Sequence, residues 1–434
     1  MLPKMVLLKQ NQPCSEEIQD IPGTVRRAIR GLVLEKDIFA GKKVGIAVGS
    51  RGISNETKIV KTVIDVVKEM GGEPVIFAAM GCHGEACAEG QREMLYSLGF
   101  TEEAMGCRVE TCAESTEYGK TESGLTVIGN TLPFTYDAII LVNRIKMHTD
   151  FSDVTESGLM KLCAIGIGNP AGCNNVHKYA LRFGYGEVIR ETGLFMIKKL
   201  PVVFGIAITE NWKHQTDRIV AVKPENILKK EIELLAAVKA QNVRIPLEKA
   251  DALIVQDIGK NISGTGMDTK VIGRIRIFGQ KEPENPHFGR IGVLHLTDAS
   301  HGNAIGIGLA DFAPMGMLDK INIRATAING WSSMCAEQGS LPCFVDTERD
   351  VFEQCIQTIG LDDPSKARIV FIQDTNTLSR IAVSESLYEA ESEDLQEEEL
   401  INNPSLEKIS EPFELRFDDD GKLLTVWENG KLQF

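Results

Sequence analysis

Three histidines and a lysine of this chain have types and spacings that could do chemistry. His148, Lys161 and His177 fall in one run, Arg144–His177, with glycines and an Asn-Pro between them, and His83 lies earlier in the chain. An imidazole with a pKa of about 6.5 suits proton transfer at neutral pH, and neutral imidazole is a common metal ligand. A lysine amine among apolar neighbours can lose its proton and form a covalent link. Together these residues are the first candidates for a reactive site.

Each of these residues also has an ordinary structural explanation. His83 and His148 could be loop histidines with satisfied hydrogen bonds, and Lys161 could extend from a helix toward water. His177 could stand at the start of a helix that covers about residues 178–200. Three further histidines have no distinctive neighbours and are predicted to be structural, namely His214, His287 and His295.

Apolar runs place several candidates at the ends of strands. We predict buried strands over residues 42–50, 74–80 and 136–143. The helix expected between the first two makes a β-α-β unit, which implies a parallel pair. Arg51, His83 and His148 each follow one of these strands. Ligands bind at the carboxyl edge of open α/β sheets, so the three residues are predicted to converge.

Two glycine-rich loops could bind anions through backbone N–H groups. Gly49-Ser50-Arg51-Gly52 precedes a helix, and Arg51 would add charge for a phosphate; an ordinary tight turn is the alternative. Ser263-Gly264-Thr265-Gly266 follows a later strand, and the alternative there is a flexible glycine loop. Trp331, further along, could contact a ligand or simply pack against the fold.

Length and pattern predict an α/β protein of two α/β domains with mostly parallel sheets and a site in the cleft between them. The 434 residues suffice for two cores. We predict an N-terminal catalytic domain over 1–248 and a C-terminal domain over 249–434. The second domain would complete the substrate site and carry an acidic segment, 384–412, and a terminal hairpin with an Asp-Gly turn.

Charge and composition argue against several classes of function. A formal net charge of -14, without a basic cluster, disfavours binding to nucleic acid. No stretch approaches the roughly 20 apolar residues that span a bilayer, and the N-terminus does not resemble a signal peptide. The ten cysteines lack zinc-ribbon spacing and are expected to be reduced thiols of a cytoplasmic protein.

The order Arg51, His83, His148, Lys161, His177 resembles the nickel-pincer-nucleotide lactate racemase family. That family has an Arg in one strand-end loop, a His in the next, and then a motif of His, Lys and a further His sixteen residues after the Lys. Lys161 and His177 have this separation, whereas the link from His148 to Lys161 is a few residues longer than usual. The resemblance covers roughly residues 40–180 well and the remainder in outline.

The resemblance implies a role for each matching position. His83 and His148 would be the paired acid/base catalysts. Lys161 would carry Ni(II) pyridinium-3,5-bisthiocarboxylic acid mononucleotide through a thioamide, and His177 would ligate its nickel. Hydride would leave C2 of a 2-hydroxy acid and return to the opposite face. Contacts to the cofactor phosphate and the substrate would come from Val48, Gly49, Ser50 and Arg51.

The second domain departs from the family pattern. The usual Tyr-Pro, Asp, Tyr-Gln and Lys substrate motif is absent, and GKNISGTGMDTK occupies its place. Asp268 and Lys270 are the nearest equivalents, and Trp331 lies about where the family has a Trp. The predicted substrate is therefore a 2-hydroxy acid or sugar acid that is different from lactate or larger, and the predicted reaction is racemisation, or epimerisation if the substrate has other stereocentres.

Two other classes of function stay open at this point. His83, His148 and His177 could hold zinc in a lyase or hydrolase, or the glycine loops could serve a non-catalytic nucleotide-binding protein. The racemase hypothesis also requires cofactor-biosynthesis proteins as partners.

Overall fold

The computed structural model describes residues 2–11, 13–50, 52–149, 151–390, 400 and 403–434. The chain divides into two compact units, which we call the N-unit (Cys14–Asn242) and the C-unit (Met1–Pro13 with Val243–Phe434). Strand β1 (Met5–Gln10) pairs with β15 (Arg380–Ser384) of the C-unit. The predicted domains therefore differ from these units mainly at the N-terminus, which joins the C-unit sheet rather than the first domain.

The N-unit is built on a six-stranded sheet in the order β4-β3-β2-β7-β8-β9. All neighbours are parallel except β8 and β9, so the predicted α/β fold with a mostly parallel sheet is confirmed here. The strands are β2 (Lys43–Val48), β3 (Glu73–Ala78), β4 (Arg108–Glu110), β7 (Ala138–Arg144), β8 (Val202–Glu210) and β9 (Thr216–Val222).

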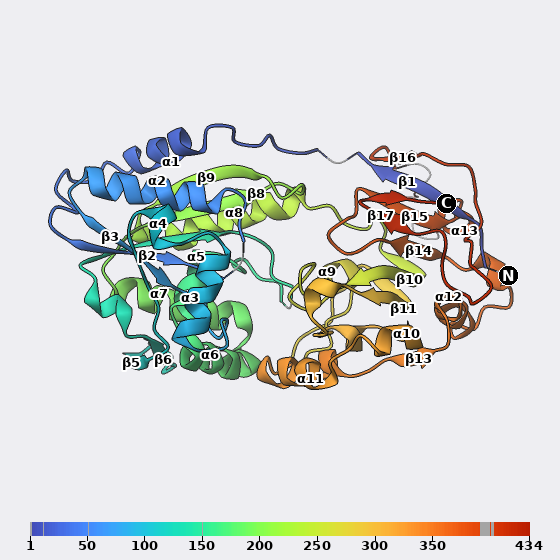
Figure 1. Cartoon of the computed structure of the whole chain (residues 1–434). Helices are drawn as coiled ribbons and strands as arrows, with labels where there is room; N and C mark the ends of the chain where they lie inside the picture. Colours follow the sequence, from blue (N-terminus) through green and yellow to red (C-terminus); the bar gives the residue numbers. More distant parts are fainter. Residues whose placement is uncertain (1, 12, 51, 150, 391–399, 401–402) are drawn as a thin grey trace. The chain divides into compact units, whose positions relative to one another are not determined.

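Helices cover both faces of this sheet because the strands are apolar on both sides. Ile46 and Ile140 face a core shared with the first two helices, whereas Phe77 and Leu141 face a core shared with the later ones. Figure 1 shows helices on both sides of this sheet. The helices are α1 (Ile21–Arg30), α2 (Glu56–Glu69), α3 (Ala88–Ser97), α4 (Glu102–Met105), α5 (Leu159–Lys161), α6 (Asn169–Phe183), α7 (Tyr185–Lys199) and α8 (Ile227–Gln241).

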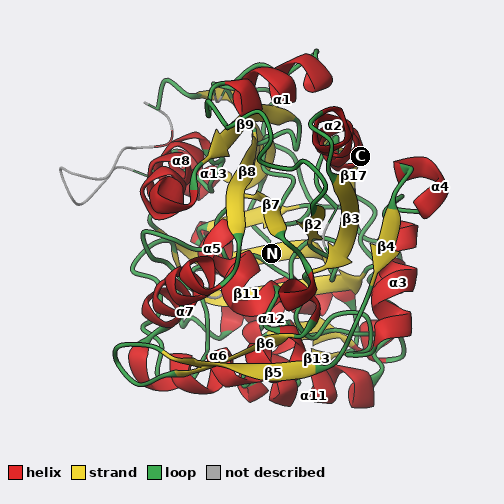
Figure 2. Cartoon of the chain, turned by 90° about the vertical axis from the view of Figure 1, so that its left-hand side faces the viewer, coloured by secondary structure: helices red, strands yellow, loops and turns green. Residues whose placement is uncertain are grey.

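A separate two-stranded ribbon completes the N-unit. Strands β5 (Ser115–Lys120) and β6 (Thr126–Asn130) pair antiparallel and lie beside α6 (Figure 2). Gly172 on α6 allows this approach, since a Cβ there would stand 2.2 Å from the Ile128 carbonyl oxygen. The ribbon therefore supports the helix that carries His177.

The C-unit contains an eight-stranded sheet in the order β13-β12-β11-β10-β14-β15-β1-β16. Its first five strands run parallel, which confirms a second α/β element with a mostly parallel core, and the last three alternate in direction. The strands not yet bounded are β10 (Lys249–Ile258), β11 (His287–Leu296), β12 (Phe312–Pro314), β13 (Cys343–Val345), β14 (Ile369–Ile372) and β16 (Leu406–Lys408).

Shorter helices and a tail complete the C-unit. The helices are α9 (Thr269–Ile272), α10 (Met315–Leu318), α11 (Ile323–Ser332), α12 (Glu348–Gln357) and α13 (Glu385–Tyr388). The predicted hairpin is only partly right: its Asp-Gly turn closes a single Phe417–Leu423 bridge, and the paired hairpin is β17 (Trp427–Glu428) with β18 (Lys431–Leu432). Of the acidic segment, residues 391–399 and 401–402 lie outside the described part of the chain.

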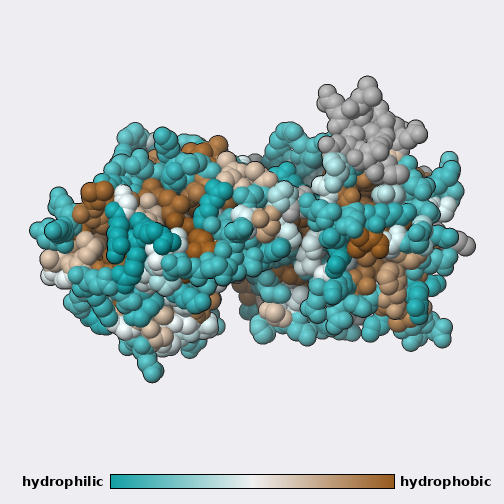
Figure 3. All heavy atoms as spheres, turned by 90° about the horizontal axis from the view of Figure 1, so that it is seen from above, coloured by the Kyte–Doolittle hydropathy of each residue, from teal (hydrophilic) through white to brown (hydrophobic). Residues whose placement is uncertain are grey.

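The surface seen in Figure 3 carries mostly polar side chains, with apolar areas between them. Among the described residues, none of the helices combines the length and apolar character needed to cross a membrane.

Candidate functional site

The predicted strand-end loops leave the same edge of the N-unit sheet. Strand β2 lies between β3 and β7, parallel to both, so their carboxyl ends are adjacent. Ser50, His83 and His148 follow these three ends. Arg51, the predicted clamp for a substrate carboxylate, lies outside the described residues.

The β2 and β3 loops are joined through His83. Its ring nitrogen Nδ1 forms a hydrogen bond with the Ser50 hydroxyl, which fixes the orientation of the imidazole. A Cβ built on Gly49 would stand 3.9 Å from Asn143 Oδ1 and 4.0 Å from Leu162, so the β2 loop passes near the segment that carries Lys161. Val48 is fully buried in the sheet core, and only its backbone could contact a cofactor.

The loop after β7 is closed around a buried carboxylate, Glu156. Its Oε2 accepts a hydrogen bond from the His148 backbone N–H at 2.5 Å, and Oε1 forms an ion pair with Lys239 of α8 at 2.6 Å. A two-residue bridge between Lys146 and Ser157 seals the base of the loop. Glu156 thereby holds His148 in place, a role that no local sequence pattern indicates.

Lys161 lies where three helical segments follow one another along the chain. It ends the short α5, a π-helix follows at Leu162–Gly166, and α6 begins at Asn169. Single π-turns are frequent at functional sites. The Gly81 backbone N–H donates to the Gly166 carbonyl at 3.0 Å, which ties the β3 loop to the π-helix. A Cβ on Gly166 would stand 2.5 Å from the Ala79 carbonyl oxygen, so this contact requires glycine.

A second buried carboxylate, Glu231 of α8, fixes the start of α5. It accepts the Met160 backbone N–H at 3.0 Å, and its other oxygen has no hydrogen-bond partner among the described residues. Burial raises the pKa of Glu231 to about 7. Gly158 makes room for this carboxyl, since a Cβ there would lie 2.4 Å from the Glu231 carboxyl carbon. One helix thus positions both the His148 loop and the Lys161 turn.

His177 lies well inside α6, which corrects the expectation that it starts a helix. The helix begins earlier because Asn169-Pro170 supplies a proline at its first turn. Loss of hydration, and secondarily the charge of Lys161, lower the pKa of His177 to about 4. Its Nδ1 hydrogen-bonds the Tyr185 hydroxyl at 3.2 Å. A neutral imidazole with an oriented ring is the form that ligates metals.

Aromatic contacts connect the two histidine segments. The His148 ring stacks on Phe151 with centroids 4.5 Å apart, and Phe151 stacks on Tyr185 at 5.4 Å. Tyr185 in turn contacts His177 edge-on at 5.5 Å. The structure therefore brings together Ser50, His83, His148, Lys161 and His177 in one region of the N-unit.

The predicted substrate contacts belong to the C-unit. Asp268 caps the N-terminus of α9 by accepting the Lys270 backbone N–H at 2.9 Å, and Trp331 on α11 is 64% exposed. The glycine loop beside them is a compact turn in which the Lys260 ammonium donates to the Gly264 carbonyl at 2.7 Å. The roles of Asp268, Lys270 and Trp331 in substrate binding stay predictions.

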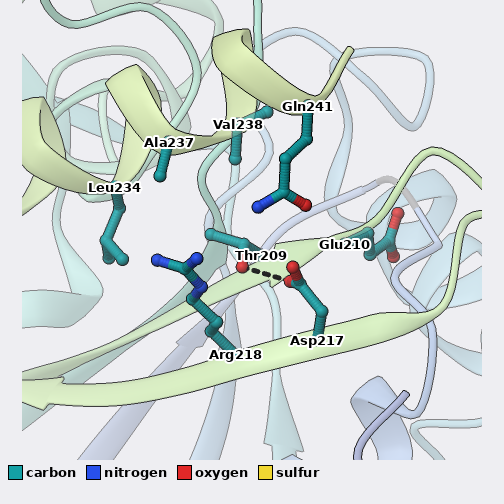
Figure 4. A pocket seen from close by; sticks show the side chains of 8 residues that line it. All are labelled: Thr209, Glu210, Asp217, Arg218, Leu234, Ala237, Val238 and Gln241. Carbon is teal, nitrogen blue, oxygen red and sulfur yellow. Dashed lines mark hydrogen bonds between the residues drawn. The ribbon is translucent and has the colours of Figure 1, made fainter. Parts of the chain in front are cut away.

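Two other polar features of the N-unit are separate from the candidate residues. Figure 4 shows a small pocket in which the Thr209 hydroxyl donates to Asp217. It lies between β8, β9 and α8 and is lined by Thr209, Glu210, Asp217, Arg218, Leu234, Ala237, Val238 and Gln241. Nearby, Glu210 forms an ion pair with Arg144.

Among the described residues, no group of three His, Cys, Asp or Glu side chains is arranged to hold a metal ion, which lends no support to a zinc centre made by the protein alone.

Comparisons with known proteins find similarity to solved structures at low sequence identity. No protein family matches the sequence, and no curated protein does. The structure is similar to that of a lactate racemase apoprotein from Thermoanaerobacterium thermosaccharolyticum, at 13% identity and a TM-score of 0.48, over 80% of this chain and 86% of that one. It is also similar to a protein from Thermotoga maritima, at 14% identity and a TM-score of 0.49, over 80% and 92% of the two chains.

Proposed function

We propose that this chain is a cytoplasmic 2-hydroxy acid racemase or epimerase that uses a nickel-pincer nucleotide. The observation that carries the proposal is a neutral, oriented His177 within the electrostatic reach of Lys161. Both residues lie in the helical segment that is hydrogen-bonded to the loop of His83. The spacing of these residues is the one that resembles the nickel-pincer lactate racemase family.

The donor set fits this cofactor. Lys161 would hold it covalently, and the imidazole of His177 would ligate its nickel. The Tyr185 hydroxyl on Nδ1 supplies the outer hydrogen bond that ligand histidines usually have. When bound, the cofactor supplies a hydride acceptor for C2 of the substrate.

The protein's own part of the reaction is proton transfer and positioning. His83 and His148 would each take or return the proton of the C2 hydroxyl. Two bases are needed because two enantiomers present that hydroxyl on different sides. Ser50 fixes the ring of His83, whereas Glu156 and Phe151 fix His148. Arg51 would bind the carboxylate, and Asp268, Lys270 and Trp331 would select the substrate.

The test uses protein purified from its native host, where the cofactor-biosynthesis proteins are present. Intact-mass and metal analysis should find an adduct on Lys161 and about one nickel per chain, and enantiopure 2-hydroxy acids should lose optical purity. Lys161→Ala should lose the adduct, whereas the matched control Lys178→Ala, an exposed lysine on α6, should keep it. Native protein that carries zinc and no adduct would refute the proposal.

A further inference from the structure

Two thiols from different elements meet beside the candidate site. Cys82 follows β3 and directly precedes His83, whereas Cys173 lies on α6, one turn before His177. Their sulfur atoms are 3.8 Å apart. The sequence does not predict that these two cysteines form a pair, because ninety-one positions separate them.

The backbone, and not only the side chains, holds the two thiols together. Gly81 donates its N–H to Gly166 of the π-helix at 3.0 Å. A Cβ built on Gly81 would stand 3.6 Å from Cβ of Cys173. The backbone just before Cys82 therefore lies close to Cys173, which keeps the two thiols on neighbouring segments.

The two thiols differ in access. Cys82 is exposed, whereas Cys173 is buried at 3% exposure. The hydrogen bond to Cys82, followed by burial, raises the pKa of Cys173, and the charge of Lys161 acts in the opposite direction. A reagent in solution therefore meets Cys82 first, and Cys173 is placed to react second.

We propose that Cys82 and Cys173 form a redox-active pair that low-molecular-weight disulfides convert to an intramolecular disulfide. The Cys82 thiolate attacks the small disulfide, which gives a mixed disulfide and releases one small thiol. Cys173 then loses its proton and attacks the Cys82 sulfur, which forms the Cys82–Cys173 bond and releases the second small thiol. Two protein thiols are oxidised and one small disulfide is reduced to two thiols.

The new bond would link the loop of His83 covalently to the helix of His177. A disulfide has a sulfur–sulfur distance of about 2.05 Å, so the two elements must close part of the present separation. Formation of the disulfide does not depend on the proposed racemase activity, whereas its effect on proton transfer by His83 rests on that proposal.

The experiment titrates the reduced full-length protein with oxidised glutathione. Peptide mapping without reductant should find peptides containing Cys82 and Cys173 joined, with two thiols lost per chain. Cys173→Ala should stop at a glutathione adduct on Cys82, and Cys82→Ser should leave Cys173 reduced. The control Cys343→Ser removes an exposed thiol of the C-unit and should leave the disulfide unchanged.

Two outcomes would contradict the proposal that Cys82 and Cys173 form a redox-active pair. One is the absence of the joined peptides while Cys343 of the wild type takes up glutathione. The other is a bond from Cys82 to Cys87 of its own loop. Both are distinct from failure of the racemase proposal, which is judged by the adduct on Lys161 and by nickel, neither of which the disulfide assay measures.

Discussion

His177 in the N-unit and His295 in the C-unit are both half-buried, yet their pKa values shift in opposite directions. Loss of hydration and Lys161 lower the pKa of His177 to about 4. Burial also acts against the charge of His295, but hydrogen bonds to Asp257 and Glu348 outweigh it and raise its pKa to about 9. At neutral pH one ring is therefore neutral and the other is an imidazolium.

The difference separates a residue suited to binding a ligand from one suited to holding a fold. His295 joins three elements, because Asp257 belongs to β10 and Glu348 to α12. Glu348 also accepts the Leu423 backbone N–H at 2.7 Å, which extends the network to the C-terminal segment. His177 instead lies within the electrostatic reach of Lys161, whose positive charge disfavours the charged form of the imidazole.

The largest contrast is expected from removing each ring in turn. His177→Ala should lose nickel and at least about a hundredfold of activity while its melting temperature changes little, because no charged network depends on it. His295→Ala should keep nickel and destabilise the protein by about 3 kcal/mol, because two carboxylates lose their shared cation. Metal analysis and chemical denaturation of both variants would check this, and equal nickel content in the two would contradict it.

A pH series sharpens the comparison within the C-unit. The raised pKa of His295 contributes stability that is complete below about pH 6.5, the ordinary histidine value, and is lost as the pH rises through about 9. We expect a loss of up to about 3 kcal/mol across this window. Hydrogen exchange of β11 peptides should accelerate accordingly in the wild type. If His295→Ala shows the same alkaline loss, His295 is not its cause.

Much of the fold follows from sequence, whereas the supports of the site do not. The runs at 42–50, 74–80 and 136–143 are strands because buried parallel strands need uninterrupted apolar residues, a local property. The hydrogen bond between Glu231 and Met160 joins residues 71 positions apart, and the one between His295 and Glu348 joins residues 53 positions apart. No local sequence pattern predicts either contact. The helix start before His177 was missed because the π-helix breaks the regular apolar period.

The buried carboxyl of Glu231 should make the stability of the N-unit depend on pH as well. Its raised pKa favours the protonated folded state, so the stability it contributes is complete below about pH 4.5 and is lost as the pH rises through about 7. Glu231→Gln should match the wild type at pH 4.5 and exceed its stability by about 2 kcal/mol at pH 8. The exposed Glu233→Gln on the same helix is the control and should alter neither value. Denaturation at the two pH values decides the matter, and a variant less stable than the wild type at pH 8 would disprove it.

The smallest effect is expected at the hydrogen bond that orients His177. Tyr185→Phe removes the hydroxyl from Nδ1 but keeps the ring that contacts Phe151 and His177, so stability should fall by only about 1 kcal/mol. Nickel affinity should fall about tenfold or more, because an unfixed imidazole is a poorer ligand. The control Tyr179→Phe alters an aromatic residue on the same helix as His177. Competition with a chelator measures the affinity, and unchanged retention of nickel in Tyr185→Phe would show that the orientation of His177 is set by packing alone.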